Sequence, residues 1–217
     1  MRCLTMAGGR ACRPNARNAL AQQDVHKAWR ETSLMSLVKF KRLFIGLELP
    51  SACRSTLVTL DPCLKGLRWL PAEQLHLTLS FLGEVEVSRI DGLREALCAI
   101  RVTPFFLPLH GIGAFNKRGQ PSVVWVGVGQ GHPHLFALHR RVQDAVLHAG
   151  IEPDLKPFHP HVTVARTKGI SRAALQPFLR RHAAVEFDLF KVTGFALYSS
   201  LLSSDGAVHQ VEFRQQL

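Results

Sequence analysis

The pattern of apolar and polar residues becomes regular from about residue 42 onward. Strands are expected where apolar residues alternate with polar ones, or run together between turn residues. These segments are 42–49, 67–70, 75–82, 105–115, 121–129, 161–166, 185–200 and 208–213. Helices are expected where apolar residues recur every three or four positions, as between Ile90 and Ile100. The helical segments are 51–60, 88–100, 135–149 and 171–181, with Ser171 as an N-cap and Gly150 as a C-cap.

Strands and helices mix along the chain without a strict alternation. This order favours an α+β fold with largely antiparallel sheets over a parallel α/β fold. Each half of the chain contains one strand with the pattern His-x-Thr and one amphipathic helix. We therefore expect two related lobes, in a pseudo-two-fold arrangement of sheets flanked by helices, with an active-site cleft between them.

The first 34 residues differ in character from the rest. They are polar and basic, and they show no period that would build a core. We interpret residues 1–34 as a disordered or non-native extension and residues 35–217 as the folded domain. Met35 stands shortly before the first strand pattern, which leaves open whether translation starts there.

Composition narrows the class of protein. The chain has 217 residues, 47% of them hydrophobic, which suffices for a substantial core. A formal net charge of +11 favours a polyanionic partner such as RNA or DNA, with an acidic membrane as a further option. Five cysteines without a CxxC pair argue against a disulfide scaffold or zinc ribbon and favour a reducing, cytoplasmic location. No apolar run reaches the roughly 18 to 20 residues that span a bilayer, so we do not expect an integral membrane protein.

Two His-x-Thr motifs carry the candidate chemistry. They lie in LHLTLSFLG, residues 75–83, and in HPHVTVAR, residues 159–166. Because side chains alternate along a strand, His76 and Thr78 share one face, and so do His161 and Thr163. The residues expected to turn toward the core are Leu77, Leu79, Phe81, Val162 and Val164. The four polar side chains would meet in one cleft if the two strands were neighbours.

In-line opening of a phosphodiester needs a base at the entering oxygen and an acid at the leaving oxygen. Two imidazoles serve both roles near neutral pH when one is neutral and the other protonated, and no metal is then needed. Threonine hydroxyls would donate to the phosphoryl oxygens, where negative charge must be stabilised. The paired motifs therefore predict metal-independent opening of a phosphodiester that has a good internal leaving group.

With these motifs, the chain resembles the two-histidine phosphoesterase superfamily over about residues 41–213. Within it, the chain is similar to the RNA 2′,3′-cyclic phosphodiesterases, also called 2′-5′ RNA ligases. The segments that carry the resemblance are RLFIGLELP, LRWLPAEQLHLTLSFLGEV, GIGAFNKRGQPSVVWVGV, KPFHPHVTVAR and VTGFALYSSLLSSDGAVHQ. Two motifs with these flanks are far more specific than one His-x-Thr alone.

The resemblance implies that His76 is the proton donor and His161 the proton acceptor, while Thr78 and Thr163 bind the phosphate. It implies hydrolysis of a terminal 2′,3′-cyclic phosphate on RNA to a 2′-phosphomonoester, with no cofactor and no metal. RNA with such an end, or a small cyclic nucleotide, is the expected partner of a monomeric enzyme. Two alternatives stay open: a 2′-5′ RNA ligase that runs the opening backwards, and a non-catalytic module that binds RNA ends or nucleotides.

Three further residues are weaker candidates. Arg166 stands three positions after Thr163 and is a tentative phosphate ligand. Strict alternation puts it on the opposite face of the strand, so a twist would have to re-aim it. Phe81 and Phe158 are tentative base-stacking residues, although packing in the core is the favoured role for both.

For two other patterns we favour an interpretation without a functional role. The pairs His132 with His134 and His159 with His161 have a His-x-His spacing that occurs in metal sites, but no carboxylate or thiolate stands beside them. Lys117 and Arg118 in the basic turn NKRGQ could contact an RNA backbone, but a solvated turn is the interpretation that we favour.

Overall fold

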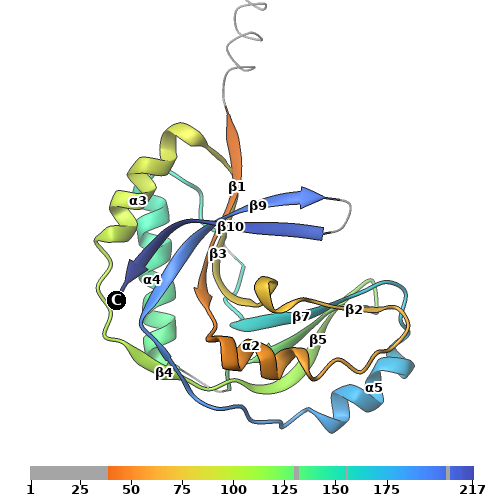
Figure 1. The fold of residues 1–217 in the computed structure, drawn as a ribbon. Coiled ribbons are helices and arrows are strands. Elements are labelled where there is room, and N and C mark those ends of the chain that lie inside the picture. Colours follow the sequence, from red (N-terminus) through yellow and green to blue (C-terminus); the bar gives the residue numbers. More distant parts are fainter. Residues whose placement is uncertain (1–38, 130–131, 155, 204–205) are drawn as a thin grey trace, which may run out of the picture. The chain divides into compact units, whose positions relative to one another are not determined.

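The computed structural model describes residues 39–129, 132–154, 156–203 and 206–217. The extension expected at residues 1–34 lies outside them. From residue 40 onward the described chain has an α+β fold in which every strand pairing is antiparallel, and helices flank the sheet (Figure 1). The fold class expected from the sequence is confirmed.

The described strands form one large sheet and one small one. The large sheet runs in the order β10-β9-β1-β3-β7-β6-β5, and β2 pairs with β7 beside this path. Its strands are β1 (Phe40–Glu48), β2 (Leu67–Trp69), β3 (His76–Glu86), β5 (His110–Lys117), β6 (Gln120–Gly127), β7 (His161–Thr167), β9 (Gly194–Ser203) and β10 (Gly206–Gln216). The small sheet consists of β4 (Phe105–Leu107) and β8 (Phe190–Val192).

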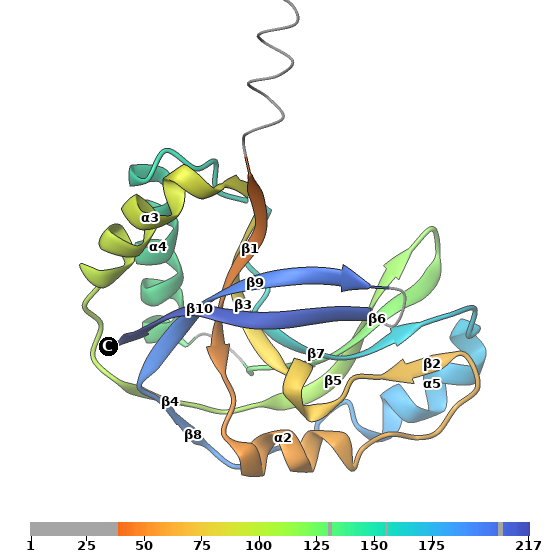
Figure 2. The ribbon, with the colours of Figure 1, turned by 45° about the horizontal axis from the view of Figure 1, so that its top comes forward.

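The helices divide between the two ends of the large sheet (Figures 1 and 2). Helices α3 and α4 lie side by side next to β1, β3, β9 and β10, whereas α2 and α5 lie toward β2, β5 and β7. Their bounds are α2 (Ser51–Val58), α3 (Ile90–Cys98), α4 (Pro133–His148) and α5 (Arg172–Arg181). Two short 3₁₀ turns, η1 (Ala72–Gln74) and η2 (Val87–Arg89), precede β3 and α3. Each half of the sheet thus has its own helices, as the expected pair of lobes requires.

The helix ends follow the local signals in the sequence. The Ser171 hydroxyl accepts a hydrogen bond from the Ala174 backbone N–H at 3.2 Å, which caps the start of α5. After α4, Gly150 adopts a positive φ of 70°, a conformation that favours glycine. The Gly150 N–H donates to Leu147 and the Ile151 N–H to Val146, so the last carbonyls of the helix are satisfied.

Two of the expected strands are wrong as single elements. The segment 105–115 is divided into β4 and β5, which belong to different sheets. Pro108 lies at this break, and proline has no N–H to continue a ladder. The segment 185–200 is divided in the same way into β8 and β9, and β4 and β8 pair with each other. A run of apolar residues therefore does not reveal where a chain leaves one sheet for another.

The two halves of the large sheet join where β3 meets β7. The joining pair is Leu77 with Val162, and both side chains are fully buried. Each of these residues is the middle residue of a His-x-Thr motif. The apolar centre of each motif therefore contributes to the junction of the sheet, while the polar residues on either side point to the opposite face.

Strands β3 and β7 each contain a β-bulge directly after the motif threonine. In β3, Leu79, which follows Thr78, has no partner in β1, and a second irregularity further along the strand leaves Leu82 unpaired. In β7 the residue without a partner in β6 is Val164, which follows Thr163. An extra residue reverses the alternation of side chains beyond it. The bulges thus decide which residues share a face with the motifs.

Deletion of residues 1–34 is expected to leave the melting temperature and the turnover unchanged, because that segment shows no core-forming pattern. A deletion of residues 1–45 is the matched control. It removes six of the nine residues of β1, a strand that lies between β3 and β9, and should abolish cooperative unfolding. Thermal denaturation of both truncated proteins measures the difference. A drop of several degrees in the shorter deletion would show that residues 1–34 stabilise the domain.

Candidate active site

The pairing of Leu77 with Val162 brings the two motifs together. In an antiparallel pair, residues one step to either side are again neighbours, and they project from the opposite face. The cross-strand neighbours on that face are His76 beside Thr163 and Thr78 beside His161. The structure therefore assembles all four predicted side chains at one place.

Each motif histidine is oriented by the backbone two residues before it. His76 Nδ1 lies 2.7 Å from the carbonyl oxygen of Gln74, and His161 Nδ1 lies 2.6 Å from that of His159. A carbonyl oxygen only accepts, so Nδ1 carries the proton in both rings. Nε2 of each ring is then the atom that gains or loses a proton, as an acid or base requires.

His76 lies in an aromatic environment. Its ring stacks on Phe44 with centroids 4.7 Å apart, and it meets His209 edge-to-face at 5.2 Å. Tyr198 also stacks on the Phe44 ring, with centroids 4.8 Å apart. Burial lowers the pKa of His76 to about 4, and positive charge on His209 adds to the effect. His76 is therefore neutral at pH 7 when the site holds no anion.

His161 has a similar but more open environment. The Phe115 ring meets the His161 ring edge-to-face, with centroids 4.9 Å apart, and the centroid of the Trp125 ring lies 6.4 Å from that of His161. Burial lowers the pKa of His161, while the hydrogen bond to the His159 carbonyl acts in the opposite direction. Its neutral form is favoured at pH 7, which suits a proton acceptor.

The bulges place two more side chains on the face that carries the motif histidines and threonines. Arg166 is exposed, and its charge lowers the pKa values of both His76 and His209, so it lies close to them. Strict alternation would place Arg166 on the opposite face of the strand. The bulge at Val164 reverses the alternation and brings Arg166 onto the face of the motif. At the matching position in β3, Phe81 is 55% exposed, so its expected place in the core was wrong. The bulge at Leu79 buries Ser80 instead.

A cavity of about 420 Å³ opens beside Thr78 and His161. Phe81 and Phe158 both contribute to its wall, together with Phe115. Its volume is in the usual range for small-molecule sites, and aromatic faces are suited to stacking a base. A larger cavity of about 690 Å³ shares Phe158 and His159 with it and is lined by none of the four motif side chains.

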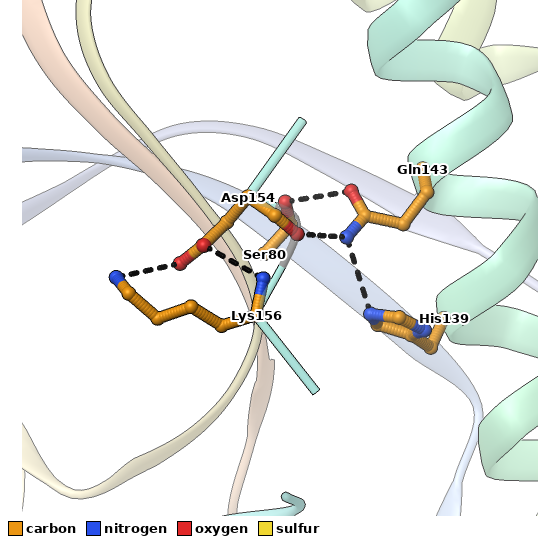
Figure 3. Close-up of polar contacts among 5 residues, drawn as sticks. All are labelled: Ser80, His139, Gln143, Asp154 and Lys156. Carbon is orange, nitrogen blue, oxygen red and sulfur yellow. Dashed lines mark hydrogen bonds and ion pairs between the residues drawn. The ribbon is translucent and has the colours of Figure 1, made fainter. Parts of the chain in front are cut away.

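A polar network forms the far wall of the smaller cavity (Figure 3). The Ser80 hydroxyl donates to Gln143 Oε1 at 3.1 Å, and Gln143 Nε2 lies 3.3 Å from both His139 Nε2 and the Asp154 carbonyl oxygen. The ring of His139 stacks on Phe158 at 3.9 Å and fixes its position. One face of Phe158 is thus already covered by protein.

Sequence reasoning missed several of these residues. His209 stands in β10, outside either motif, and Phe115 and Gln143 come from β5 and α4. The only signal in the sequence for His209 is a histidine within an alternating strand close to the chain end. No local pattern shows that β10 passes near β3, because two other strands lie between them in the sheet.

The motif threonines, possible metal ligands and possible membrane-spanning helices complete the description of the predicted features. No hydrogen bond joins the hydroxyl of Thr78 or Thr163 to another described residue, so both are available to a ligand. Among the residues that the structure describes, no three His, Cys, Asp or Glu side chains are placed to hold a metal ion. In that same part of the chain, no helix is both long enough and apolar enough to cross a membrane.

The fold and the site together define a two-lobed protein with paired histidine–threonine motifs on adjoining antiparallel strands. Comparison with known families agrees. The sequence model of the 2'-5' RNA ligase superfamily matches residues 51–203, which is more than half of the chain. The chain therefore belongs to the 2'-5' RNA ligase superfamily.

Individual relatives support this assignment. The chain is 37% identical over 139 residues to a protein of Aeropyrum pernix named RNA 2',3'-cyclic phosphodiesterase, covering 64% of this chain and 79% of the relative. A protein of Aquifex aeolicus with the same name is 34% identical over 147 residues, covering 66% and 78%. The crystal structure of Escherichia coli LigT complexed with 3'-AMP has a TM-score of 0.68 and 27% identity, covering 82% of this chain and 99% of that one.

Inorganic sulfate is expected to bind more tightly as the pH falls from about 8 to about 5.5. Burial keeps His76 and His161 neutral at the higher pH, and an anion beside them raises their pKa values, so binding takes up protons. Sulfate keeps its own charge over this range. Calorimetry measures the affinity, and buffers with different ionisation enthalpies count the protons taken up.

The control is a double variant, His76→Asn with His161→Asn, which keeps all other histidines of the chain. Its sulfate affinity should change much less with pH. An equally steep change in the double variant would assign the effect to the general basic charge of the protein and not to the two motif histidines.

Proposed function

We propose that this chain hydrolyses terminal 2′,3′-cyclic phosphates of RNA to 2′-phosphomonoesters, by acid and base catalysis that needs no metal. The observation that carries the proposal is the matched pair of motifs. Two imidazoles, each with Nδ1 bound to a backbone carbonyl, stand on one face with two threonine hydroxyls. The names of the relatives support the same reaction.

The reaction balances with the two histidines alone. A water molecule attacks phosphorus while His161 Nε2 accepts its proton. The bond between phosphorus and O3′ breaks, and His76 Nε2 gives its proton to O3′. The products are a 2′-phosphate and a 3′-hydroxyl. His161 ends protonated and His76 neutral, and exchange with solvent restores the first state.

The remaining side chains have supporting roles in this proposal. Thr78, Thr163 and Arg166 bind the phosphoryl oxygens and stabilise their negative charge in the transition state. Phe81 and Phe158 hold the terminal base in the smaller cavity, where each presents part of an aromatic ring. The donor role of His76 requires that it gain a proton when the anionic substrate arrives, because its pKa in the free protein is low.

The setting of the enzyme is part of the proposal. We place it in the cytoplasm as a monomer that acts on RNA ends or small cyclic nucleotides, with residues 35–217 as the catalytic domain. The three described cysteines, Cys53, Cys63 and Cys98, are free thiols, which suits a reducing compartment.

Mass analysis of the products tests the reaction directly. An RNA oligonucleotide that ends in a 2′,3′-cyclic phosphate should gain one water and carry a 2′-phosphate, with turnover unchanged in excess EDTA. A joined product with a second RNA that has a 5′-hydroxyl would instead identify a ligase. Binding without any product would identify a non-catalytic module. Loss of activity in EDTA with rescue by one divalent metal would contradict the mechanism.

Substitution of the motif residues tests the roles. His76→Ala and His161→Ala should each lower turnover by roughly 10² to 10⁴ in a folded protein. The double variant should be little worse than the poorer single one, because both proton transfers belong to one step. Thr78→Val and Thr163→Val should cost about 2 to 4 kcal/mol of transition-state stabilisation at most.

The matched control for these variants is His134→Ala, which removes an exposed histidine at the start of α4. It should keep wild-type turnover. Near wild-type turnover in His76→Ala or in His161→Ala would show that the histidine is structural and that the mechanism is wrong.

A further inference from the structure

A third histidine lies at the catalytic centre although it belongs to neither motif. His209, from β10, meets the ring of His76 edge-to-face, with centroids 5.2 Å apart and an interplanar angle of 87°. Phe44 contacts both rings: it stacks on His76 and meets His209 edge-to-face at 4.9 Å. The two imidazoles are therefore held in direct contact by a shared aromatic neighbour.

His209 differs from the motif histidines in its hydrogen bonding. The Nδ1 atoms of His76 and His161 are bound to backbone carbonyls, which fixes their ring protons. His209 Nδ1 is buried and has no hydrogen-bond partner among the described residues. The protein thus fixes the tautomer of the two motif histidines and leaves His209 without such a constraint.

The charges around this pair are nearly all positive. Arg166 from β7 acts on both rings, and His161 of the same strand acts on His76. Burial, and then Arg166, lower the pKa of His209 as well, so the two rings repel each other only when both take up a proton. Burial raises the pKa of Tyr198 from β9, which keeps it neutral. Glu48 is the cross-strand partner of His76 in β1, and its carboxylate is engaged by Arg214 at 2.9 and 3.0 Å.

A proton on His76 in the free protein would therefore stand beside Arg166 and, once His209 is protonated, beside a second charge, with no unengaged carboxylate of a described residue to offset it. Two positive charges in ring contact repel each other, and this repulsion is strong where water is excluded. A phosphate anion at the motif threonines would offset the repulsion. The state of His76 is thus coupled to whether the site is occupied.

We propose that His209 is a positioning residue that, in addition to burial, opposes a charge on His76 in the free enzyme, so that His76 acquires its proton only together with the anionic substrate. This inference rests on the function proposed above, because it explains how a histidine that is neutral in the free protein serves as the proton donor.

The test is an NMR titration of His76 in the full chain without substrate, in the wild type and in two variants. His209→Phe keeps an aromatic ring against Phe44 and removes the charge, so the His76 midpoint should rise by on the order of one pH unit. His209→Arg keeps a permanent charge, so the midpoint should stay at or below the wild-type value. The His76 signal is identified by its loss in His76→Asn.

The two variants separate charge from packing, because a merely structural role would move the midpoint in the same direction in both. His134→Phe, at an exposed position on α4, is the control and should leave the midpoint unchanged. The limb of the pH profile of kcat/KM that belongs to His76 should move to higher pH in His209→Phe.

The outcomes are distinct. An unchanged His76 midpoint in His209→Phe, with the fold confirmed by its melting curve, overturns the inference even if the wild type hydrolyses cyclic phosphates. A raised midpoint in His209→Phe with none in His209→Arg supports it. If that result comes with no turnover in the wild type, the coupling of the two histidines stands and the proposed function fails.

Discussion

The site depends on one backbone pairing, that of Leu77 with Val162. These buried side chains join the two halves of the large sheet, and the four polar motif side chains are fixed on the opposite face as a consequence. A slip of one residue in this pairing would turn the histidines into the core and the aliphatic side chains into the cleft. The stability of the sheet and the geometry of the site are therefore set by the same contact.

Burial of the motif histidines costs free energy, and it also makes the site selective. Placing an imidazole among aromatic rings disfavours its charged form, which is why the pKa of His76 is about 4. The carbonyls of Gln74 and His159 partly offset this cost, because each satisfies one ring nitrogen. The remaining nitrogen of each ring is left to a ligand. A polar atom that has no hydrogen-bond partner in the protein itself is typical of a site that binds a ligand.

Much of this arrangement could be predicted from the sequence. Alternation gave the strands that carry the motifs, and the caps at Ser171 and Gly150 gave the ends of two helices. The fold class followed from the same local patterns, and so did the shared face of His76 with Thr78 and of His161 with Thr163. That the two motifs meet depended on the two strands being neighbours, which the structure shows. Strand boundaries at Pro108 and near Thr193 were missed, because an apolar run looks alike whether it belongs to one sheet or to two.

The sequence could not predict the bulges. A bulge is a property of two paired strands, and no single strand shows it. Strict alternation therefore placed Phe81 in the core and turned Arg166 away from the site, whereas the extra residues Leu79 and Val164 reverse both. His209 was missed for a related reason, since its contact with His76 arises from sheet order and not from local sequence.

The matched bulges have a consequence for how a ligand is oriented. A pocket with true two-fold symmetry would hold a five-membered cyclic phosphate equally well in two orientations, exchanging O2′ and O3′. Here the two equivalent positions carry different side chains, an aromatic ring at Phe81 and a guanidinium at Arg166. Only one of the two orientations would place the base against the Phe81 ring and the phosphate beside the Arg166 guanidinium. In the proposed reaction, the difference between these two side chains would select which ester bond of the cyclic phosphate faces His76.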